Sequence, residues 1–411
     1  MQQTQASIGR WQGVGLLVTT MLGTGLFILP QLTVELVGAQ ALWSWTLLVL
    51  AMLPVAQVYA ALGRQYPHAG GPAQFVELAF SPRQGRIIGL MFLLMVPIGA
   101  PAAIEITMEF VSLLVPVSGV SKPWIELALL GSILLLNWRG IQASSIWQTA
   151  LTLTILAIVI VLLLVRPSPE EQVQPLFHSG GGSILTALGL AVWSFIGVET
   201  MTHLVTEFKN PRRDFQFALL MGVLLVGLIY LGCTWLMLSV STGGGLAMSL
   251  VFDRVFGAGG RWIIGIVGAL SGLATINVYV ASASRLMASL SAQGALPAVF
   301  ARQNRFRVPG IALMTELGAI SVVLLTATLM ELPYSLLIQW TNGVIVLIYL
   351  MSMLAGIKLV PSQRLYAVSA AALCLLFAVS LGINMLYGLI LWGSLQLLYF
   401  LRQRPSLLEA R

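Results

Sequence analysis

Two apolar stretches decide the fold of this chain, VGLLVTTMLGTGLFILP at residues 14–30 and WSFIGVETMTHL at residues 193–204. Each belongs to a run of membrane-helix character, yet each is interrupted by glycine, at Gly23-Thr24-Gly25 and at Gly197. The second interruption also carries a carboxylate, Glu199. Because glycine permits backbone conformations outside the helix, the pattern predicts two helices that are broken within a membrane. Glycine also serves as a packing residue in such helices, but a matched pair with a carboxylate favours a functional role.

The composition around these stretches is that of an integral membrane protein. The chain has 411 residues, of which 58% are hydrophobic and 9% are charged, whereas about a quarter of a soluble domain is charged. The first apolar run is longer than a signal-peptide core and no cleavage pattern follows it, so we expect it to remain as a membrane helix. With roughly 20 residues for each crossing, the sequence predicts an all-α protein of about twelve spans, at about 12–37, 41–62, 87–115, 123–138, 143–165, 183–206, 216–240, 261–290, 310–330, 335–357, 365–382 and 384–401.

The basic residues predict the orientation of these spans. If the N-terminus is cytoplasmic, 17 of the 21 Lys and Arg residues fall in cytoplasmic segments, as the positive-inside rule requires. The formal charge of +7 is therefore read as a topology signal and not as a nucleic-acid surface. Both termini, including a short tail at 402–411, are predicted to be cytoplasmic.

The spacing of the two broken spans predicts an internal repeat. They lie five spans apart, and because five is odd the two halves of the chain would have opposite orientations in the membrane. Paired broken helices in matching positions are typical of inverted-repeat transporters with a binding site near the bilayer midplane. The sequence thus predicts a single transmembrane domain over 1–401, with repeats at about 12–165 and 183–357 and two extra helices at about 365–401.

Several motifs resemble those of the amino acid–polyamine–organocation superfamily of transporters. They are the first break followed by Phe27 and Pro30, a loop at 66–71 reading YPHAGG, and the second break followed by a charged segment at 207–214. The resemblance implies a five-plus-five inverted-repeat fold with broken helices one and six. Shorter stretches at 15–25, 203–211 and 342–356 are similar to bacterial inner-membrane exporters of L-methionine and branched-chain amino acids. This implies proton-coupled export of neutral apolar amino acids, and the alternative is an importer or exchanger of other amino acids, including cationic ones.

The breaks have the chemistry to bind an amino acid. A helix N-terminus presents backbone N–H groups to an anion, so Gly23, Thr24 and Gly25 are predicted to bind the substrate carboxylate. The substrate ammonium is predicted to bind backbone carbonyls at the breaks, those of Thr20, Met21, Phe195 and Ile196. Gly197 is predicted to permit the second unwound turn. An alternative is that Thr20 and Met21 only fill the helix. Apolar walls are expected from Met21, Ile98, Phe195 and Ile196, with Trp193 and Trp340 as further candidates.

The coupling ion is expected to be a proton, without any cofactor or metal. A carboxylate inside a membrane is costly to ionise and is a functional hypothesis by default, so Glu199 is the first candidate for proton coupling and Glu105 the second. The alternative for Glu199 is a structural hydrogen bond that fixes the unwound segment. Sodium is the less favoured coupling ion, with Ser271 and Thr275 as its candidate ligands.

Other classes of protein are disfavoured. The sequence contains no HExxH, GxSxG or GxxxxGK[ST] pattern, so an enzyme is not expected. The two cysteines, Cys233 and Cys374, lie in apolar runs and do not suggest a disulfide or a metal site. The expected partners are an amino acid and membrane lipid, with no nucleic acid, and the protein is expected to be a monomer or a homodimer.

Overall fold

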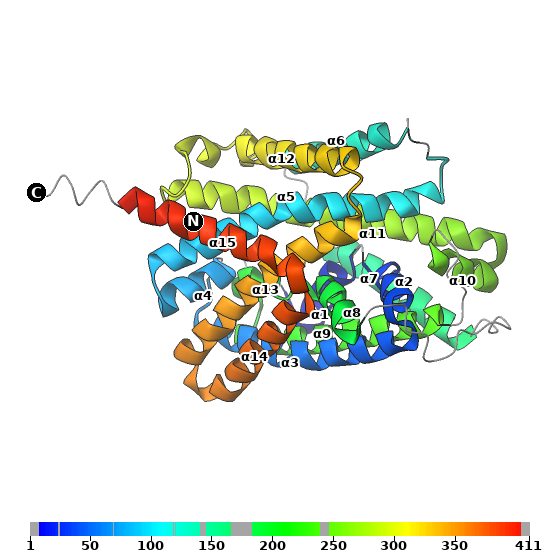
Figure 1. Cartoon of the computed structure of the whole chain (residues 1–411), viewed down its shortest axis with the longest axis horizontal. Helices are drawn as coiled ribbons and strands as arrows, with labels where there is room; N and C mark the ends of the chain where they lie inside the picture. The colour runs from blue at the N-terminus through cyan, green and yellow to red at the C-terminus, as the bar shows by residue number, and fades with distance from the viewer. Residues whose placement is uncertain are drawn as a thin grey trace, which may run out of the picture.

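The computed structural model describes residues 8–23, 25–68, 70–117, 119, 121–139, 145–165, 183–238 and 246–403. Within these ranges the regular secondary structure is helical apart from one isolated bridge between Ile8 and Phe208, and turns and loops connect the helices. Figure 1 shows long helices that run side by side, with α4 and α10 near opposite ends of the molecule. The α-helices are α1 (Arg10–Leu22), α2 (Leu29–Val37), α3 (Ala41–Gln65), α4 (Gly71–Ala79), α5 (Pro82–Ser112), α6 (Lys122–Trp138), α7 (Ser145–Val165), α8 (Ile184–Ala191), α9 (Gln216–Met237), α10 (Ala247–Phe256), α11 (Gly260–Ala292), α12 (Gly310–Leu329), α13 (Tyr334–Leu359), α14 (Arg364–Ser380) and α15 (Met385–Gln403).

The helices have the length and composition of membrane spans. Within the described ranges, nine helical segments are long and apolar enough to cross a bilayer, so the chain is an all-helical membrane protein. Three predicted spans are not among the nine. The span at 12–37 is divided into α1 and α2, α6 has only 17 residues, and the described apolar helix Leu153–Val165 within α7 is also short for a crossing. The count of twelve therefore stays a prediction.

Two short helices lie outside the long ones. Gly71–Ala79 forms the short helix α4. The segment 241–260 has loop composition, yet it contains α10, which buries Met248, Val251 and Phe252. Hydropathy alone did not indicate α10, because its ten residues carry an amphipathic pattern that is stabilised by packing on α11.

Glycine allows the longest pair of helices to pack closely. Gly265, Gly268 and Gly272 lie on the face of α11 that meets α5. A Cβ atom at Gly268 would lie only 2.3 Å from the Phe110 ring, and one at Gly272 only 2.1 Å from the Thr107 hydroxyl. Small residues at such positions let membrane helices approach and gain van der Waals contact.

The same device joins α3 to α9. A Cβ atom at Gly227 would lie 2.3 Å from the Val49 side chain. A polar contact adds to the packing between α6 and α11, where the Asn137 amide donates to the Asn277 side-chain carbonyl at 2.6 Å. Hydrogen bonds of this kind contribute to helix association inside a membrane, where the groups would otherwise lack partners.

Gly227→Ala should lower the thermal unfolding midpoint of the purified protein in detergent. The new methyl group overlaps the stiff, branched Val49 side chain, and overpacking of this kind costs about 1–3 kcal/mol. Gly318→Ala in α12 is the matched control, since a Cβ atom there meets nothing within 4 Å. Equal midpoints for the two variants would show that the α3–α9 contact does not limit stability.

Candidate functional site

The first break lies between α1 and α2. Gly23 has φ +29°, a conformation that L side chains rarely adopt, and α1 ends just before it. The N–H of Gly25 makes no hydrogen bond with any residue in the described part of the chain. In a continuous helix it would bond to the Met21 carbonyl, so the break releases a donor and an acceptor that lie one turn apart. Thr24, the central residue of the predicted site, lies outside the described residues.

The second break follows α8. The helix tightens into a 3₁₀ turn at Val192–Phe195, Ile196 is extended, and Gly197 has φ +126° before a second 3₁₀ helix at Thr200–Glu207. Asn342 of α13 donates to the carbonyls of Gly189 at 2.8 Å and Leu190 at 3.3 Å. The Ile196 carbonyl accepts no hydrogen bond from a described residue. This break therefore also leaves a backbone acceptor available.

The two breaks face each other across a short distance. A Cβ atom at Gly197 would lie 3.1 Å from Cγ2 of Thr20 and 3.4 Å from Cγ of Met21. On the far side of the first break, the Ser271 hydroxyl of α11 donates to the Gly23 carbonyl at 2.8 Å. The predicted proximity of the two interrupted spans is thus present in the structure.

A cavity lies at the meeting point of the breaks. Its walls come from both breaks and from α5, α11 and α13, and none of the described residues that line it carries a formal charge. Apolar side chains predominate, and the polar ones are hydroxyl groups. The lining residues are Thr20, Met21, Gly23, Gly25, Met95, Val96, Gly99, Ala100, Ala103, Trp193, Ile196, Thr275, Ile276, Tyr279 and Thr341.

Of the eight predicted binding residues, five line the cavity, two do not, and Thr24 lies outside the described residues. Thr20, Met21, Gly23, Gly25 and Ile196 line the cavity, and so does Trp193.

Phe195 and Gly197 lie directly behind the wall. The Phe195 carbonyl accepts a hydrogen bond from the Tyr349 hydroxyl at 3.0 Å. Trp340, one of the expected wall residues, stacks on Tyr387 with 5.5 Å between ring centroids and does not line the cavity. Ile98 packs against the core instead of lining the cavity.

From α5 the sequence indicated only Ile98 as a wall residue, and the residues of α5 that line the cavity are different ones. Met95, Gly99 and Ala103 follow one another at four-residue intervals, and Val96 and Ala100 form the adjacent row. This face of small residues and methionine is a signal that periodicity could have revealed. Nothing in the sequence alone indicates that this face, and not another face of α5, meets the breaks.

Glu199 is completely buried beneath the second break. Its carboxyl group accepts the Gly197 N–H at 2.9 Å and contacts the Tyr349 hydroxyl. The same hydroxyl contacts the Phe195 carbonyl, which can only accept. The Tyr349 hydroxyl has one proton and can donate it to only one of these two groups. When Glu199 is protonated, its carboxyl donates to the Tyr349 oxygen and Tyr349 donates to the Phe195 carbonyl, so both contacts are hydrogen bonds. The geometry therefore combines a structural role with a site that can hold a proton.

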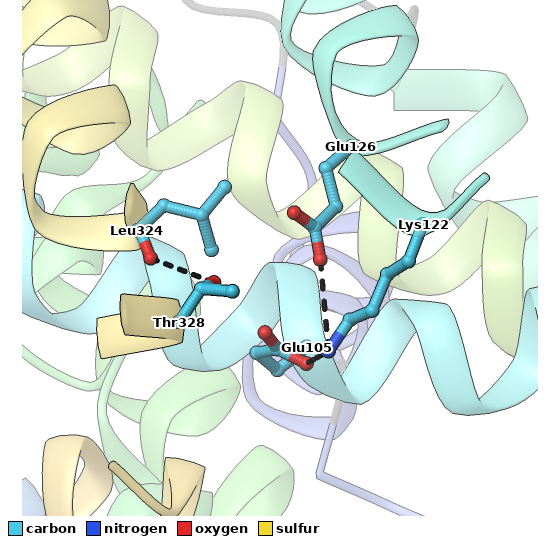
Figure 2. A network of polar contacts seen from close by, with 5 residues as sticks. All are labelled: Glu105, Lys122, Glu126, Leu324 and Thr328. Carbon is cyan, nitrogen blue, oxygen red and sulfur yellow. Dashed lines mark hydrogen bonds and ion pairs between the residues drawn. The ribbon is translucent and has the colours of Figure 1, made fainter. Parts of the chain in front are cut away.

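Glu105 lies apart from the cavity. Its carboxylate pairs with Lys122 of α6 at 2.6 Å, and Lys122 also lies 3.8 Å from Glu126. Figure 2 shows the Lys122 ammonium between the two carboxylates, beside the segment of α12 in which Thr328 bonds to the Leu324 carbonyl. Ala103 faces the cavity, and Glu105, two residues further along the helix, faces α6. Glu105 is thus an ion-pair partner between helices.

The candidate sodium ligands are engaged with each other and with the first break. The Ser271 hydroxyl donates to Gly23, and the Thr275 hydroxyl donates to the Ser271 carbonyl at 3.0 Å. Among the described residues, no cluster of three or more His, Cys, Asp or Glu side chains could hold a metal ion.

Comparison with known proteins places this architecture in a family. Residues 8–395 match the family model described as amino acid permease. The chain is 36% identical to the L-methionine/branched-chain amino acid exporter YjeH of Escherichia coli strain K12, over 99% of both chains. It is 25% identical to an uncharacterized amino acid permease, YecA of Bacillus subtilis strain 168, over 87% of this chain and 86% of that one. It is 21% identical to the cadaverine/lysine antiporter of E. coli K12, over 79% and 76% of the two chains. The chain therefore belongs to the amino acid permease family within the amino acid–polyamine–organocation superfamily, and it is a multi-pass amino acid transporter and not an enzyme.

Proposed function

We propose that this protein exports neutral apolar amino acids, namely L-methionine, leucine, isoleucine and valine, across a bacterial inner membrane. The observation that carries the proposal is an uncharged, largely apolar cavity between two helix breaks that release backbone N–H and C=O groups. In the cavity wall, the Gly25 N–H can donate to a substrate carboxylate, and the Ile196 carbonyl can accept from the substrate ammonium. Similarity to the E. coli exporter over nearly the whole chain supports the same substrate class.

The cavity wall argues for an apolar substrate side chain. Met21, Met95 and Ile276 offer flexible or branched hydrocarbon surface, and methionine adapts to apolar groups of different shape. A lysine or arginine side chain would bring a charge that no described lining residue neutralises, and an unpaired charge out of water is costly. Import or exchange of other amino acids, including cationic ones, is therefore the less supported alternative.

The proposed mechanism is alternating access by two inverted repeats in a twelve-span protein with both termini cytoplasmic. Two features support it. The broken spans lie five apart, and the packing follows the same offset: α3 packs on α9, and α5 packs on α11. Each of these helices is the predicted counterpart of its neighbour in the other half. The charge asymmetry of the loops supports the orientation.

Proton antiport is proposed to depend on Glu199. The carboxyl group lies directly behind the wall that contains Ile196, and its hydrogen bonds to Gly197 and Tyr349 join two elements that meet at the cavity. A proton on Glu199 completes both Tyr349 contacts, whereas its loss leaves a buried anion with neutral donors only. Hydration of the group in one conformation would favour release of the proton on that side.

Counterflow in proteoliposomes tests the substrate class. With vesicles preloaded with unlabelled leucine, labelled leucine, methionine, isoleucine and valine should accumulate, while lysine and arginine should not, because no described wall residue pairs with their charge. Accumulation of labelled lysine at a rate comparable to leucine would contradict the proposal.

Gly25→Val should abolish leucine binding and counterflow while the protein still inserts in the membrane. A Cβ atom at this position would lie 2.7 Å from Cδ1 of Leu29 and 3.0 Å from the Tyr230 hydroxyl, and the two further methyl groups would fill the gap at the N–H. Gly131→Val in α6, where a Cβ atom meets nothing within 4 Å, should bind normally. Unchanged leucine or methionine affinity in Gly25→Val would refute the carboxylate site.

Glu199→Gln should retain leucine exchange and lose its acceleration by a pH gradient. The amide preserves the shape, accepts the Gly197 N–H and donates to Tyr349, as a protonated carboxyl does. Glu316→Gln, which replaces a buried carboxyl of α12, should keep the response to the gradient. Gradient-driven transport that survives in Glu199→Gln would assign coupling to another group, with Glu105 next to be tested. Loss of binding as well as coupling would indicate a purely structural role.

A further inference from the structure

Three buried polar groups that have no partner among the described residues lie close together behind the first break, near the space left by the missing side chain of Gly25, which we call the gap behind Gly25. The Gly25 N–H is one of them. The hydroxyl groups of Tyr230 in α9 and Ser194 in the 3₁₀ turn after α8 are the other two, and neither makes a hydrogen bond with a described residue. Buried polar groups are nearly always satisfied, so unsatisfied ones that share a location indicate a missing ligand.

The three groups come from three separate elements. A Cβ atom built on Gly25 would lie 3.0 Å from the Tyr230 hydroxyl, so the absent side chain leaves that hydroxyl open to the break. The hydroxyls of Tyr230 and Ser194 lie near each other but outside hydrogen-bond geometry. All three groups can donate a proton, and no charged side chain is involved. Such a set suits an anion oxygen placed between the donors.

The Tyr230 side chain is held in place before any ligand arrives. Its ring stacks on Trp45 of α3 with 4.4 Å between centroids and 9° between planes. The Trp45 indole N–H donates to Thr33 of α2 at 3.0 Å, and Thr33 bonds to the Leu29 carbonyl at 2.9 Å. The hydroxyl is therefore fixed relative to the half-helix that follows the break, and donors held in advance lose little freedom on binding.

We propose that the Tyr230 hydroxyl, with Ser194 beside it, completes the binding site for the substrate carboxylate. The inference rests on the proposed function and adds a residue from α9 to it. Tyr230 does not line the cavity, whereas Gly25 does. A carboxylate that reaches the hydroxyl must therefore enter the gap between the two half-helices, with one oxygen at the Gly25 N–H. A buried water molecule in the gap is the competing explanation.

The test compares leucine with L-leucinol, in which a hydroxymethyl group replaces the carboxylate. Competition with labelled leucine in proteoliposomes gives both affinities for the wild type, Tyr230→Phe and Ser194→Ala. Tyr230→Phe should weaken leucine binding about 10- to 100-fold, the size expected for a hydrogen bond to a charged group, and leucinol binding by less than about threefold. Ser194→Ala should also weaken leucine binding more than leucinol binding, and it provides the test if Tyr230→Phe fails to insert.

Tyr387→Phe in α15 removes a tyrosine hydroxyl away from the breaks, and it should change neither affinity. If Tyr230→Phe weakens the binding of leucine and leucinol equally, or leaves both affinities unchanged, the inference is overturned. Either result would indicate that a structural water occupies the gap. A wild-type protein that binds no leucine would overturn the proposed function itself. Wild-type binding of leucine with no selective effect of Tyr230→Phe would leave that function intact and remove only the role of Tyr230.

Discussion

Backbone hydrogen bonding is the constraint on which this structure depends. A bilayer offers no water to an exposed N–H or C=O group, so an interrupted membrane helix must find partners within the protein. Here the partners are specific: Ser271 serves the Gly23 carbonyl, Asn342 serves the carbonyls of Gly189 and Leu190, and the Glu199 carboxyl accepts the Gly197 N–H. Ser271 joins the first break to α11, Asn342 joins the helix before the second break to α13, and the Glu199 bond lies within the second break itself. At the cavity, the Gly25 N–H and the Ile196 carbonyl have no hydrogen-bond partner among the described residues.

Close helix packing makes this satisfaction possible. The polar side chains that serve the breaks are short, so the helices that carry them must come close to the interrupted spans. Glycines on α9 and α11 let these helices pack closely on α3 and α5, because Val49, Phe110 and Thr107 occupy the space that a Cβ atom would need. Packing and polar satisfaction therefore support the same arrangement. The result is a frame of closely packed long helices around the two helix breaks.

The arrangement also separates the substrate from the buried carboxyl group. None of the described lining residues is charged, while the buried Glu199 carboxyl accepts a hydrogen bond from Gly197, the residue next to Ile196 in the wall. A change in the unwound segment would alter both the cavity and the hydrogen bonds of Glu199. The proposed link between substrate movement and proton movement thus needs no direct contact between the two. Glu105 has no such position, because its charge is matched by Lys122 between α5 and α6.

The sequence by itself determined much of this protein. Apolar runs indicated the helices, Gly23 and Gly197 marked the two breaks, and the motifs around them indicated the family, because each of these signals depends on local composition and backbone freedom. Five of the eight predicted substrate residues line the cavity, because they lie at or next to the two breaks that the glycines marked; they are Thr20, Met21, Gly23, Gly25 and Ile196.

The tertiary structure alone decided which face of α5 forms the wall, that Glu105 pairs with Lys122, and that Tyr349 contacts Glu199. It also brought Tyr230 and Ser194 to the gap behind Gly25. These contacts join residues far apart in the chain. Their geometry follows from how helices rotate and approach one another, which single-sequence periodicity does not specify.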